Sequence, residues 1–316
     1  MVSVVIPVYN DFQHLERCLD ALDGQSIRKK LEIVVSLDGG EPLPERISKR
    51  TDKVVENGHV GPAAARNRGW QVSTGKLVLF TDADCVPDRM WADEMVKVLE
   101  AGADAVKGVY SSGGDRIIQR LAQVEFEERY RILSKSRTID TIDTYSAGYR
   151  RSVLEKTGGF DETFPFPDHE DIDLSYRMAK EGYSLRFAPL AKVSHSHRDT
   201  WRTYFKMKSS RGMWRTKVLR KFPDKVWGGS YTPQCLKIQI ILCPLLVAVL
   251  LLLVFYPMLF ALWAAVFILS SIPLILTAFR TDISLVPLIP VFAFWRSCAL
   301  FSGLSRGIFN FGEADG

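Results

Sequence analysis

The sequence predicts an α/β domain with a mostly parallel sheet, followed by transmembrane helices. Two observations carry this prediction: short β-branched runs alternate with helical segments early in the chain, and long apolar stretches fill its last quarter. Overall composition decides less, because 47% hydrophobic and 24% charged residues are compatible with one large core. We expect an α/β domain over residues 1–200, a juxtamembrane segment over 201–235 and a membrane region over 236–316.

The first elements follow from the spacing of apolar residues. Residues 2–8 and 31–37 are short β-branched runs, and apolar side chains recur at helical spacing between them. A third apolar run at 77–81 follows a helical segment at 63–72. Such units predict parallel strands joined by crossover helices. Ligands bind beyond the carboxyl ends of strands in these sheets, and polar residues stand at these ends here.

The last quarter of the chain is predicted to cross a membrane. Residues 236–256 and 258–279 are each about as long as the ~20 residues that span a hydrocarbon core, and Lys237 is their only charge. Pro257 separates the two stretches, which indicates either a tight hairpin or one kinked element, and their combined length favours two spans. Residues 284–309 are apolar but contain two arginines and two prolines, so they form either a third span or an interfacial helix.

The juxtamembrane segment, residues 201–235, is basic and aromatic. From Arg198 to Lys237 its only acidic residues are Asp199 and Asp224, and aromatic residues are interleaved with lysine and arginine. Segments of this kind lie against anionic headgroups on the cytoplasmic side. A nucleic-acid surface is the alternative, but the apolar stretches that follow favour the membrane. We therefore expect an integral membrane protein whose first domain is cytoplasmic, at the cell membrane in a prokaryote, with no nucleic-acid partner.

The five cysteines exclude two classes of small scaffold. They form no C-x-x-C pair and no short regular framework. Neither a structural zinc site nor a disulfide-stabilised fold is therefore predicted. A reducing cytosol suits cysteines of this kind.

The strongest local signal for chemistry is the triplet Asp82-Ala83-Asp84, which follows the apolar run at 77–81. Two carboxylates at the end of a strand offer hard oxygen ligands, which suit Mg²⁺ or Mn²⁺. A metal ion held there can bridge to a diphosphate and neutralise its charge as it leaves. The triplet alone is weak evidence, because acidic pairs are common in ordinary loops.

Six further motifs give this triplet a context. They are V-V-I-P-V-Y-N-D at 4–11, L-D-G-G at 37–40, G-P-A-A-A-R-N at 61–67, A-G-Y-R-R at 147–151, G-G-F-D at 158–161 and H-E-D-I-D-L at 169–174. In this order the motifs resemble glycosyltransferase family 2 of the GT-A fold, over about residues 2–200. The resemblance implies a metal-dependent, inverting transfer of a sugar from a UDP, GDP or dTDP donor.

The resemblance also implies how the donor is held. Pro7, Tyr9 and Asp38 would border the nucleotide base, with Asp38 accepting a hydrogen bond from it. Arg66 would approach the diphosphate. The structural alternatives are a proline at a strand end, an aspartate in a turn and a solvated arginine.

For the metal, the resemblance implies that Asp84 is a direct ligand and that Asp82 contacts the ribose or the metal. His195 and His197 stand at a predicted strand end, where a period of two places both rings on one face. Many members of the family have a histidine here, and in some it completes the metal site. One of the two is expected to bind the ion, and the sequence does not choose between them.

On the acceptor side, Glu170 and Asp171 open a predicted helix, where acidic residues also complement the positive helix end. The resemblance assigns this pair to the acceptor site, with Asp171 as the general base that removes a proton from the acceptor hydroxyl. Gly148 and Arg150 are expected to line the same site. Arg150 and Arg151 either meet a lipid pyrophosphate or are solvated before the next helix.

The main functional hypothesis is transfer of a single sugar to a hydroxyl of a lipid-linked or membrane-surface glycan. Processive synthases of the family carry a Q-x-x-R-W signature, and this chain has S-S-R-G-M-W at 209–214 instead. A polyprenyl-phosphate sugar synthase is the alternative, since a phosphate acceptor needs no base, and the Glu170-Asp171 pair argues against it. An inert membrane scaffold is less favoured because the acidic motifs are intact.

Overall fold

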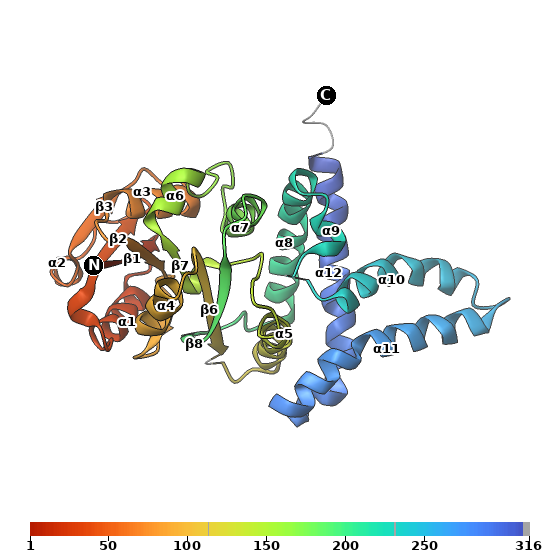
Figure 1. Cartoon of the computed structure of the whole chain (residues 1–316). Helices are drawn as coiled ribbons and strands as arrows, with labels where there is room; N and C mark the ends of the chain where they lie inside the picture. Colours follow the sequence, from red (N-terminus) through yellow and green to blue (C-terminus); the bar gives the residue numbers. More distant parts are fainter. Residues whose placement is uncertain (113, 231, 312–316) are drawn as a thin grey trace. The chain divides into compact units, whose positions relative to one another are not determined.

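The computed structural model describes residues 1–112, 114–230 and 232–311. The chain divides into two compact units (Figure 1). Unit 1 comprises Met1–Gly113 and Leu133–His195, and unit 2 comprises Gly114–Ile132 and Ser196–Gly316. Unit 1 thus differs from the expected domain 1–200 mainly in one inserted segment, Gly114–Ile132, which belongs to unit 2. Residues 312–316 of the expected membrane region lie outside the described residues.

An eight-stranded sheet forms the centre of unit 1, in the order β3-β2-β1-β4-β7-β6-β8-β5. Its strands are β1 (Val2–Val8), β2 (Leu31–Leu37), β3 (Lys53–Glu56), β4 (Leu77–Phe80), β5 (Val86–Pro87), β6 (Ala105–Ser112), β7 (Ala147–Arg150) and β8 (Leu185–His195). Strands β1 to β4 pair in parallel, as the sequence predicts. Beyond them the sheet becomes mixed, because β7 runs antiparallel to both β4 and β6.

The helices of unit 1 are α1 (Phe12–Asp23), α2 (Glu45–Ser48), α3 (Pro62–Val72), α4 (Trp91–Glu100), α6 (Arg151–Thr157) and α7 (Glu170–Lys180). In α1 the residues at helical spacing, Leu15, Cys18, Leu19 and Leu22, are buried. The side chain of Asp11 caps this helix by accepting a hydrogen bond from the His14 amide. Apolar periodicity and capping therefore account for α1 as the sequence predicts.

Two glycines set the position of α3, the helix that carries Arg66. Gly61 precedes the helix with φ of 92°, a backbone conformation that side chains disfavour. Gly69 faces β1, where an added Cβ would lie 2.4 Å from Val5 Cγ1. Only glycine lets the helix lie this close to the strand, and this proximity holds α3 against β1.

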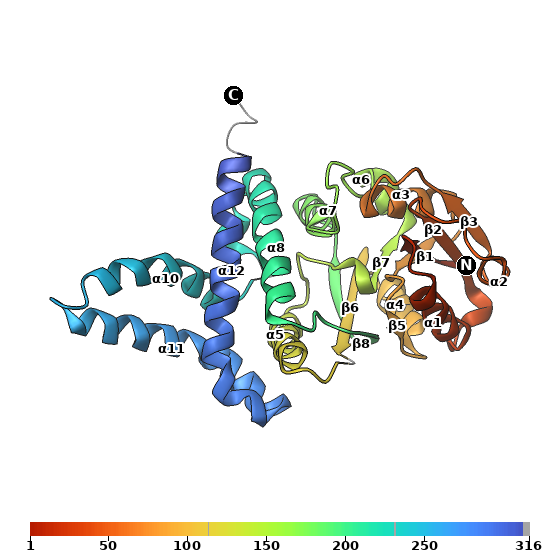
Figure 2. The ribbon, with the colours of Figure 1, turned by 180° about the vertical axis from the view of Figure 1, so that it is seen from behind.

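Unit 2 is helical. Its helices are α5 (Ile117–Leu133), which ends one residue into unit 1, α8 (Trp201–Lys221), α9 (Lys225–Gly228), α10 (Gln234–Leu251), α11 (Pro257–Thr281) and α12 (Ile289–Asn310), with the short η3 (Ile283–Leu288) before α12. α8 and α12 lie side by side in both ribbon views, and α10 and α11 form a hairpin that projects sideways from them (Figures 1 and 2).

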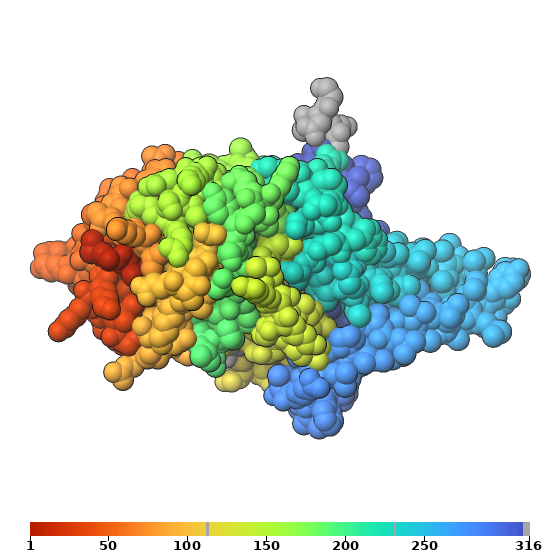
Figure 3. Space-filling view, viewed as in Figure 1, coloured from red at the N-terminus to blue at the C-terminus, as the bar shows by residue number. Residues whose placement is uncertain are grey.

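Three segments of unit 2 are long and apolar enough to cross a membrane: Gln234–Leu251, Pro257–Thr281 and Ile283–Asn310. The first two correspond to the apolar stretches expected from the sequence and make up the α10–α11 hairpin, a narrow projection in the space-filling view (Figure 3). Its turn, residues 252–256, is exposed and bears no charge. The apolar surface of this hairpin has the composition of a membrane anchor.

Candidate active site

The acidic triplet lies where β4 ends. The backbone amide of Thr81 still donates to Val5 of β1, and the chain then turns so that Asp82 and Asp84 project beyond the sheet. Their carboxylates and the Cys85 thiol lie within 4.8 Å of one another. The structure thus brings the two expected metal-binding carboxylates together at the carboxyl end of a parallel strand.

A histidine reaches this triplet through strand pairing. β5 pairs with β8, with Val86 opposite Ser194, and this register brings the end of β8 beside the triplet. The His195 Nε2 lies 3.0 Å from Asp84 Oδ2. The strand ends at His195, so the expected period of two does not extend to His197, which belongs to unit 2.

His197 has other partners within unit 2. Its ring stacks on Phe126 at a centroid distance of 5.1 Å, and its Nε2 lies 2.9 Å from Gln123 Oε1. Of the two candidate histidines, His195 is therefore the one that contacts an expected metal ligand.

The donor set around Asp84 suits a divalent ion. Two carboxylates and one imidazole are ligands that Mg²⁺ or Mn²⁺ accepts, with the imidazole favouring the transition metal. Cys85 is a poor fourth ligand, because burial and the charges of Asp82 and Asp84 raise the pKa of its thiol well above the ordinary value. The thiol stays protonated and donates to Asp84. The residues present therefore fit an ion held by oxygen and nitrogen.

Arg66 joins the triplet to the second acidic motif. Its guanidinium donates through Nη2 to Asp82 at 2.9 Å and through Nη1 to Glu170 at 2.6 Å. The Arg66 side chain is 3% exposed and that of Glu170 is 2% exposed, so this ion pair is shielded from water, whereas the Asp82 side chain is 30% exposed. Burial alone would lower the pKa of Arg66, but the carboxylates of Asp82 and Glu170 raise it, so the residue stays charged. Arg66 is thus a fixed positive charge between two acidic groups.

The acidic pair at the start of α7 is strongly perturbed. Burial, followed by the charge of Asp171, raises the pKa of Glu170 to about 8. Burial also raises the pKa of Asp171 above its ordinary value. The Asp171 carboxylate accepts hydrogen bonds from the amides of Thr144, at 3.3 Å, and Ile172, at 2.8 Å, which fix its orientation. An oriented carboxylate with a raised pKa is suited to accept a proton near neutral pH.

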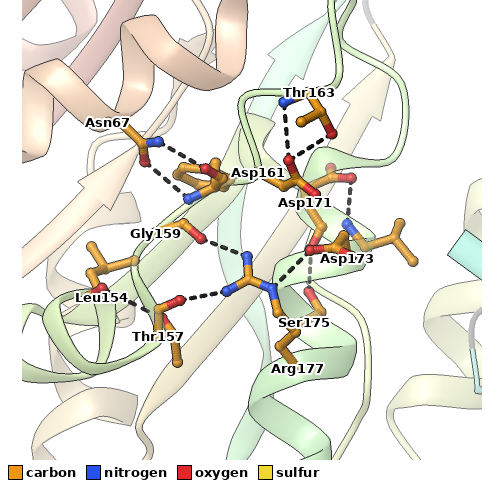
Figure 4. A network of polar contacts seen from close by, with 12 residues as sticks. Asn67, Leu154, Thr157, Gly159, Asp161, Thr163, Asp171, Asp173, Ser175 and Arg177 are labelled. Carbon is orange, nitrogen blue, oxygen red and sulfur yellow. Dashed lines mark hydrogen bonds and ion pairs between the residues drawn. The ribbon is translucent and has the colours of Figure 1, made fainter. Parts of the chain in front are cut away.

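The rest of the first turn of α7 is structural. Arg177 pairs with Asp173 at 2.8 Å and donates to the carbonyls of Thr157 and Gly159, each at 2.6 Å (Figure 4). Ser175 donates to the Asp171 carbonyl at 2.6 Å. These contacts tie the helix to the preceding loop and hold the Asp171 backbone in place.

The residues expected to border the nucleotide base form a second cluster. Asp38 accepts hydrogen bonds from the amides of Val60, at 2.8 Å, and Gly61, at 3.1 Å, so part of its acceptor capacity holds the loop before α3. Tyr9 is 51% exposed, and its ring lies 4.4 Å from that of His59. Pro7 lies within β1, opposite Ser36.

His59 was not expected from the sequence. Its Nδ1 lies 3.1 Å from the Asp38 carbonyl, and its backbone has φ of 56°. The signal for it was local: a histidine between Gly58 and Gly61 in the loop that opens a helix. Together with Tyr9 it presents two aromatic faces beside Asp38.

Gly148 and Arg150, which are expected to bind the acceptor, both lie in β7 and make structural contacts there. Gly148 lies within β7, where an added Cβ would be 2.8 Å from both Leu79 and Val106, so it is a packing glycine. Arg150 donates to the carbonyls of Ala103, at 2.9 Å, and Leu99, and so caps the end of α4. These contacts hold β7 against its neighbouring strands and against the end of α4.

A buried lysine near the acidic pair was also missed. Lys107 of β6 forms an ion pair with Asp143 and donates to the Tyr145 hydroxyl at 3.3 Å. Asp143 directly precedes Thr144, whose amide binds Asp171. The signal was a lysine inside an apolar strand pattern, because a buried charge in a strand requires a partner.

Comparison with known proteins agrees with this arrangement. The model of the family described as Glycosyl transferase family 2 matches residues 3–158. Glycosyltransferase AglE of Haloferax volcanii is 31% identical over 59% of this chain and 64% of its own length. The pre-mycofactocin glycosyltransferase of Mycobacterium tuberculosis is 29% identical over 71% of this chain and 48% of its own. The chain therefore spans about half to two thirds of these relatives.

Solved structures share the fold. The mannosyltransferase PcManGT from Pyrobaculum calidifontis, in complex with GDP-Man and Mn²⁺, has a TM-score of 0.61 at 21% identity over 98% of this chain and 87% of its own. S. aureus TarS 1–349, in complex with UDP-GlcNAc, has a TM-score of 0.50 at 16% identity over 97% and 92%. The expected α/β fold of the GT-A type is thereby confirmed. Through residues 3–158 the chain belongs to glycosyltransferase family 2.

Proposed function

We propose that this protein is an inverting glycosyltransferase that moves a single sugar from a nucleotide-sugar donor to a hydroxyl of a lipid-linked or membrane-surface glycan. The observation that carries the proposal is Arg66, which joins Asp82 of the triplet to Glu170 of the acidic pair. One charged network therefore connects Asp82, a carboxylate suited to hold the ion, with Glu170, which directly precedes the proposed base Asp171.

On the donor side, Asp82, Asp84 and His195 would hold Mg²⁺ or Mn²⁺. When bound, the ion would neutralise the negative charge of the diphosphate. Tyr9, His59 and Asp38 would border the base. Solved structures of the same fold contain GDP-Man with Mn²⁺ or UDP-GlcNAc, which supports a UDP or GDP donor and leaves dTDP open.

On the acceptor side, Asp171 acts as the general base. It takes the proton from the acceptor hydroxyl while that oxygen forms a bond to the anomeric carbon. The bond from that carbon to the nucleotide diphosphate breaks on the opposite face, so the configuration inverts and no covalent sugar intermediate forms. The Thr144 and Ile172 amides orient Asp171 for this task.

The proposal is tested by assaying membranes that contain the protein with labelled UDP-, GDP- and dTDP-sugars and a lipid extract. Label should enter the organic phase with at least one donor, and membranes that carry the Asp84→Ala variant should give no such product. If no donor yields a product that depends on Asp84, or if only free sugar is released, glycosyl transfer to a lipid-linked acceptor is excluded.

We propose further that the α10–α11 hairpin anchors the protein in the membrane, with unit 1 in the cytoplasm. Its apolar surface is exposed and uncharged from Ile238 to Phe279. We expect the full chain to stay in the membrane fraction through a wash at ~1 M salt, because the Debye length falls to about 3 Å and headgroup attraction is lost while hydrocarbon burial is not. Immunoblotting of pellet and supernatant measures this. Release by salt alone would contradict anchoring by the hairpin.

A further inference from the structure

The third apolar helix, α12, runs parallel to α8. Near one end of the pair, Trp295 Nε1 donates to the Trp201 carbonyl at 3.2 Å. Near the other end, Arg220 Nη2 donates to the Ile308 carbonyl at 3.2 Å. The helices therefore stay together along most of the length of α8, which is ~30 Å at 1.5 Å per residue.

Small residues bring the two backbones into contact. A Cβ added to Gly303 of α12 would lie 2.0 Å from the carbonyl oxygen of Ser209. A Cβ added to Gly307 would lie 2.4 Å from Thr216 Oγ1. On the other helix, a Cβ at Gly212 would lie 2.6 Å from the Leu300 carbonyl oxygen. No lipid chain fits between helices packed this closely. α12 must therefore lie at the same membrane depth as α8.

The charge of α8 sets that depth. Its described residues include no acidic residue. Its basic residue Lys208 is buried, and the following basic ones are not: Arg202, Lys206, Arg211, Arg215, Lys217, Arg220 and Lys221. A charged side chain at the centre of a bilayer is costly, and basic side chains are stable among anionic headgroups. α8 therefore lies at the membrane surface, and α12 lies there with it.

The inner face of α12 carries a buried charge among apolar and small residues. Arg296 is 1% exposed, donates to Gln239 of α10 at 3.2 Å and lies 4.0 Å from Glu125 of α5. Glu125 accepts hydrogen bonds from Lys208 and Tyr204 of α8, each at 2.8 Å. A buried charge network thus ties α12 to two charged helices, a packing that suits the membrane surface better than the hydrocarbon core.

The outer face of α12 is apolar and aromatic. Val291 and Phe309 are exposed, and Trp295 packs against Phe205 of α8 with ring centroids 5.0 Å apart. Aromatic rings next to basic side chains are typical of helices that lie in the interface between headgroups and acyl chains. The α10–α11 hairpin projects sideways from the pair (Figures 1 and 2). When the hairpin enters the bilayer, the pair lies along its surface.

We propose that α12 does not cross the membrane, and that α8 and α12 form one interfacial platform bound to anionic lipid headgroups, with the α10–α11 hairpin as the inserted element. Of the two alternatives for residues 284–309, a third span and an interfacial helix, α12 is then the interfacial helix. The inference goes beyond the proposed function, and its test does not depend on catalysis.

The test measures how deeply spin labels on α12 lie in the bilayer of anionic vesicles. The native cysteines are replaced by serine. Labels are placed one at a time at Val291→Cys, Ser302→Cys and Phe309→Cys. The outer two positions are eighteen residues and about five turns apart, so they share one face, and Ser302 lies between them near that face. We expect all three labels to be equally shallow, and a label at Val254→Cys, at the exposed tip of the hairpin, to be deep. A crossing helix would instead make Ser302 the deepest of the three.

Sidedness gives a second, independent readout. A membrane-impermeant maleimide should reach Asn310→Cys on α12 and Lys206→Cys on α8 from the same side of sealed vesicles. Labelling from opposite sides would overturn the proposal, as would a deep label at Ser302, and in both cases hairpin anchoring still stands if Val254 is deep. A water-exposed label at Val254 would overturn the hairpin anchor itself. Labels on α12 that are shielded from both water and lipid would show a protein partner on this face and overturn lipid binding.

Discussion

Replacing Asp84 by alanine is expected to lower the rate of sugar transfer by ~10³-fold or more, because the carboxylate would hold the ion that neutralises the leaving diphosphate. Its side chain is 44% exposed and contributes little to the core. We therefore expect the unfolding temperature to change by no more than about 2 °C, as for most surface substitutions. Turnover of a purified donor and a thermal melt on the same preparation measure both quantities.

Asp88→Ala is the matched control. Asp88 is also an exposed aspartate, four residues beyond Asp84, and its hydrogen bonds with Lys192, Trp91 and Gln25 are made by its backbone. This variant should keep turnover within about twofold, since surface changes away from a site cost little. Removal of divalent ions by a chelator should reproduce the Asp84→Ala loss, and added Mn²⁺ or Mg²⁺ should restore the original protein but not the variant. Normal turnover of Asp84→Ala, or of the fully chelated protein, would rule out a metal held by this carboxylate.

The first half of the sheet was predictable because its strands carry their signal locally. β1, β2 and β4 are buried on both faces and therefore appear as continuous β-branched runs. β7 was not predictable, since Ala147–Arg150 is short and its glycine fits between the side chains of two neighbouring strands. Its antiparallel direction depends on pairing with strands that lie far from it in the sequence.

In the candidate site, too, residues with a local sequence signal were predictable and contacts that depend on long-range strand pairing were not. Asp82, Asp84 and the acidic pair were found because each stands at the boundary of an element with a readable pattern. The contact between Asp84 and His195 depends on pairing of β5 with β8, which no local pattern encodes. The packing of Gly148 and the contacts of Arg150 with the end of α4 were not predictable, because a glycine or an arginine in a short strand does not reveal which neighbours it meets.

Asp171 is expected to be needed for the rate of transfer and not for binding of the donor. Asparagine keeps the size of the side chain and can still accept a hydrogen bond from Thr144, but it cannot take up the acceptor proton. Asp171→Asn should therefore bind donor nucleotide almost normally and lose roughly 10²-fold or more in transfer rate. Nucleotide titration and single-turnover kinetics on the same variant measure the two quantities separately.

The proposed role of Asp171 also predicts how the transfer rate changes with pH. Because burial raises the pKa of Asp171, the carboxylate becomes protonated at a higher pH than an ordinary aspartate and then cannot act as a base. The transfer rate should fall as the pH decreases through this raised pKa, so the acidic limb of the profile should lie above the usual carboxylate range. The residual activity of Asp171→Asn should lack this limb.

Asp173→Asn separates catalysis from the electrostatics of the helix end. Asp173 lies in the same first turn of α7, but it is fully buried and paired with Arg177. Its replacement should lower the melting temperature and leave the turnover of the folded protein nearly unchanged. If Asp171 also served only the helix end, its asparagine variant would lose about 0.3 to 1 kcal/mol of stability and keep its turnover. That result would remove Asp171 from the mechanism and favour a polyprenyl-phosphate acceptor, because a phosphate oxygen attacks the sugar without a base.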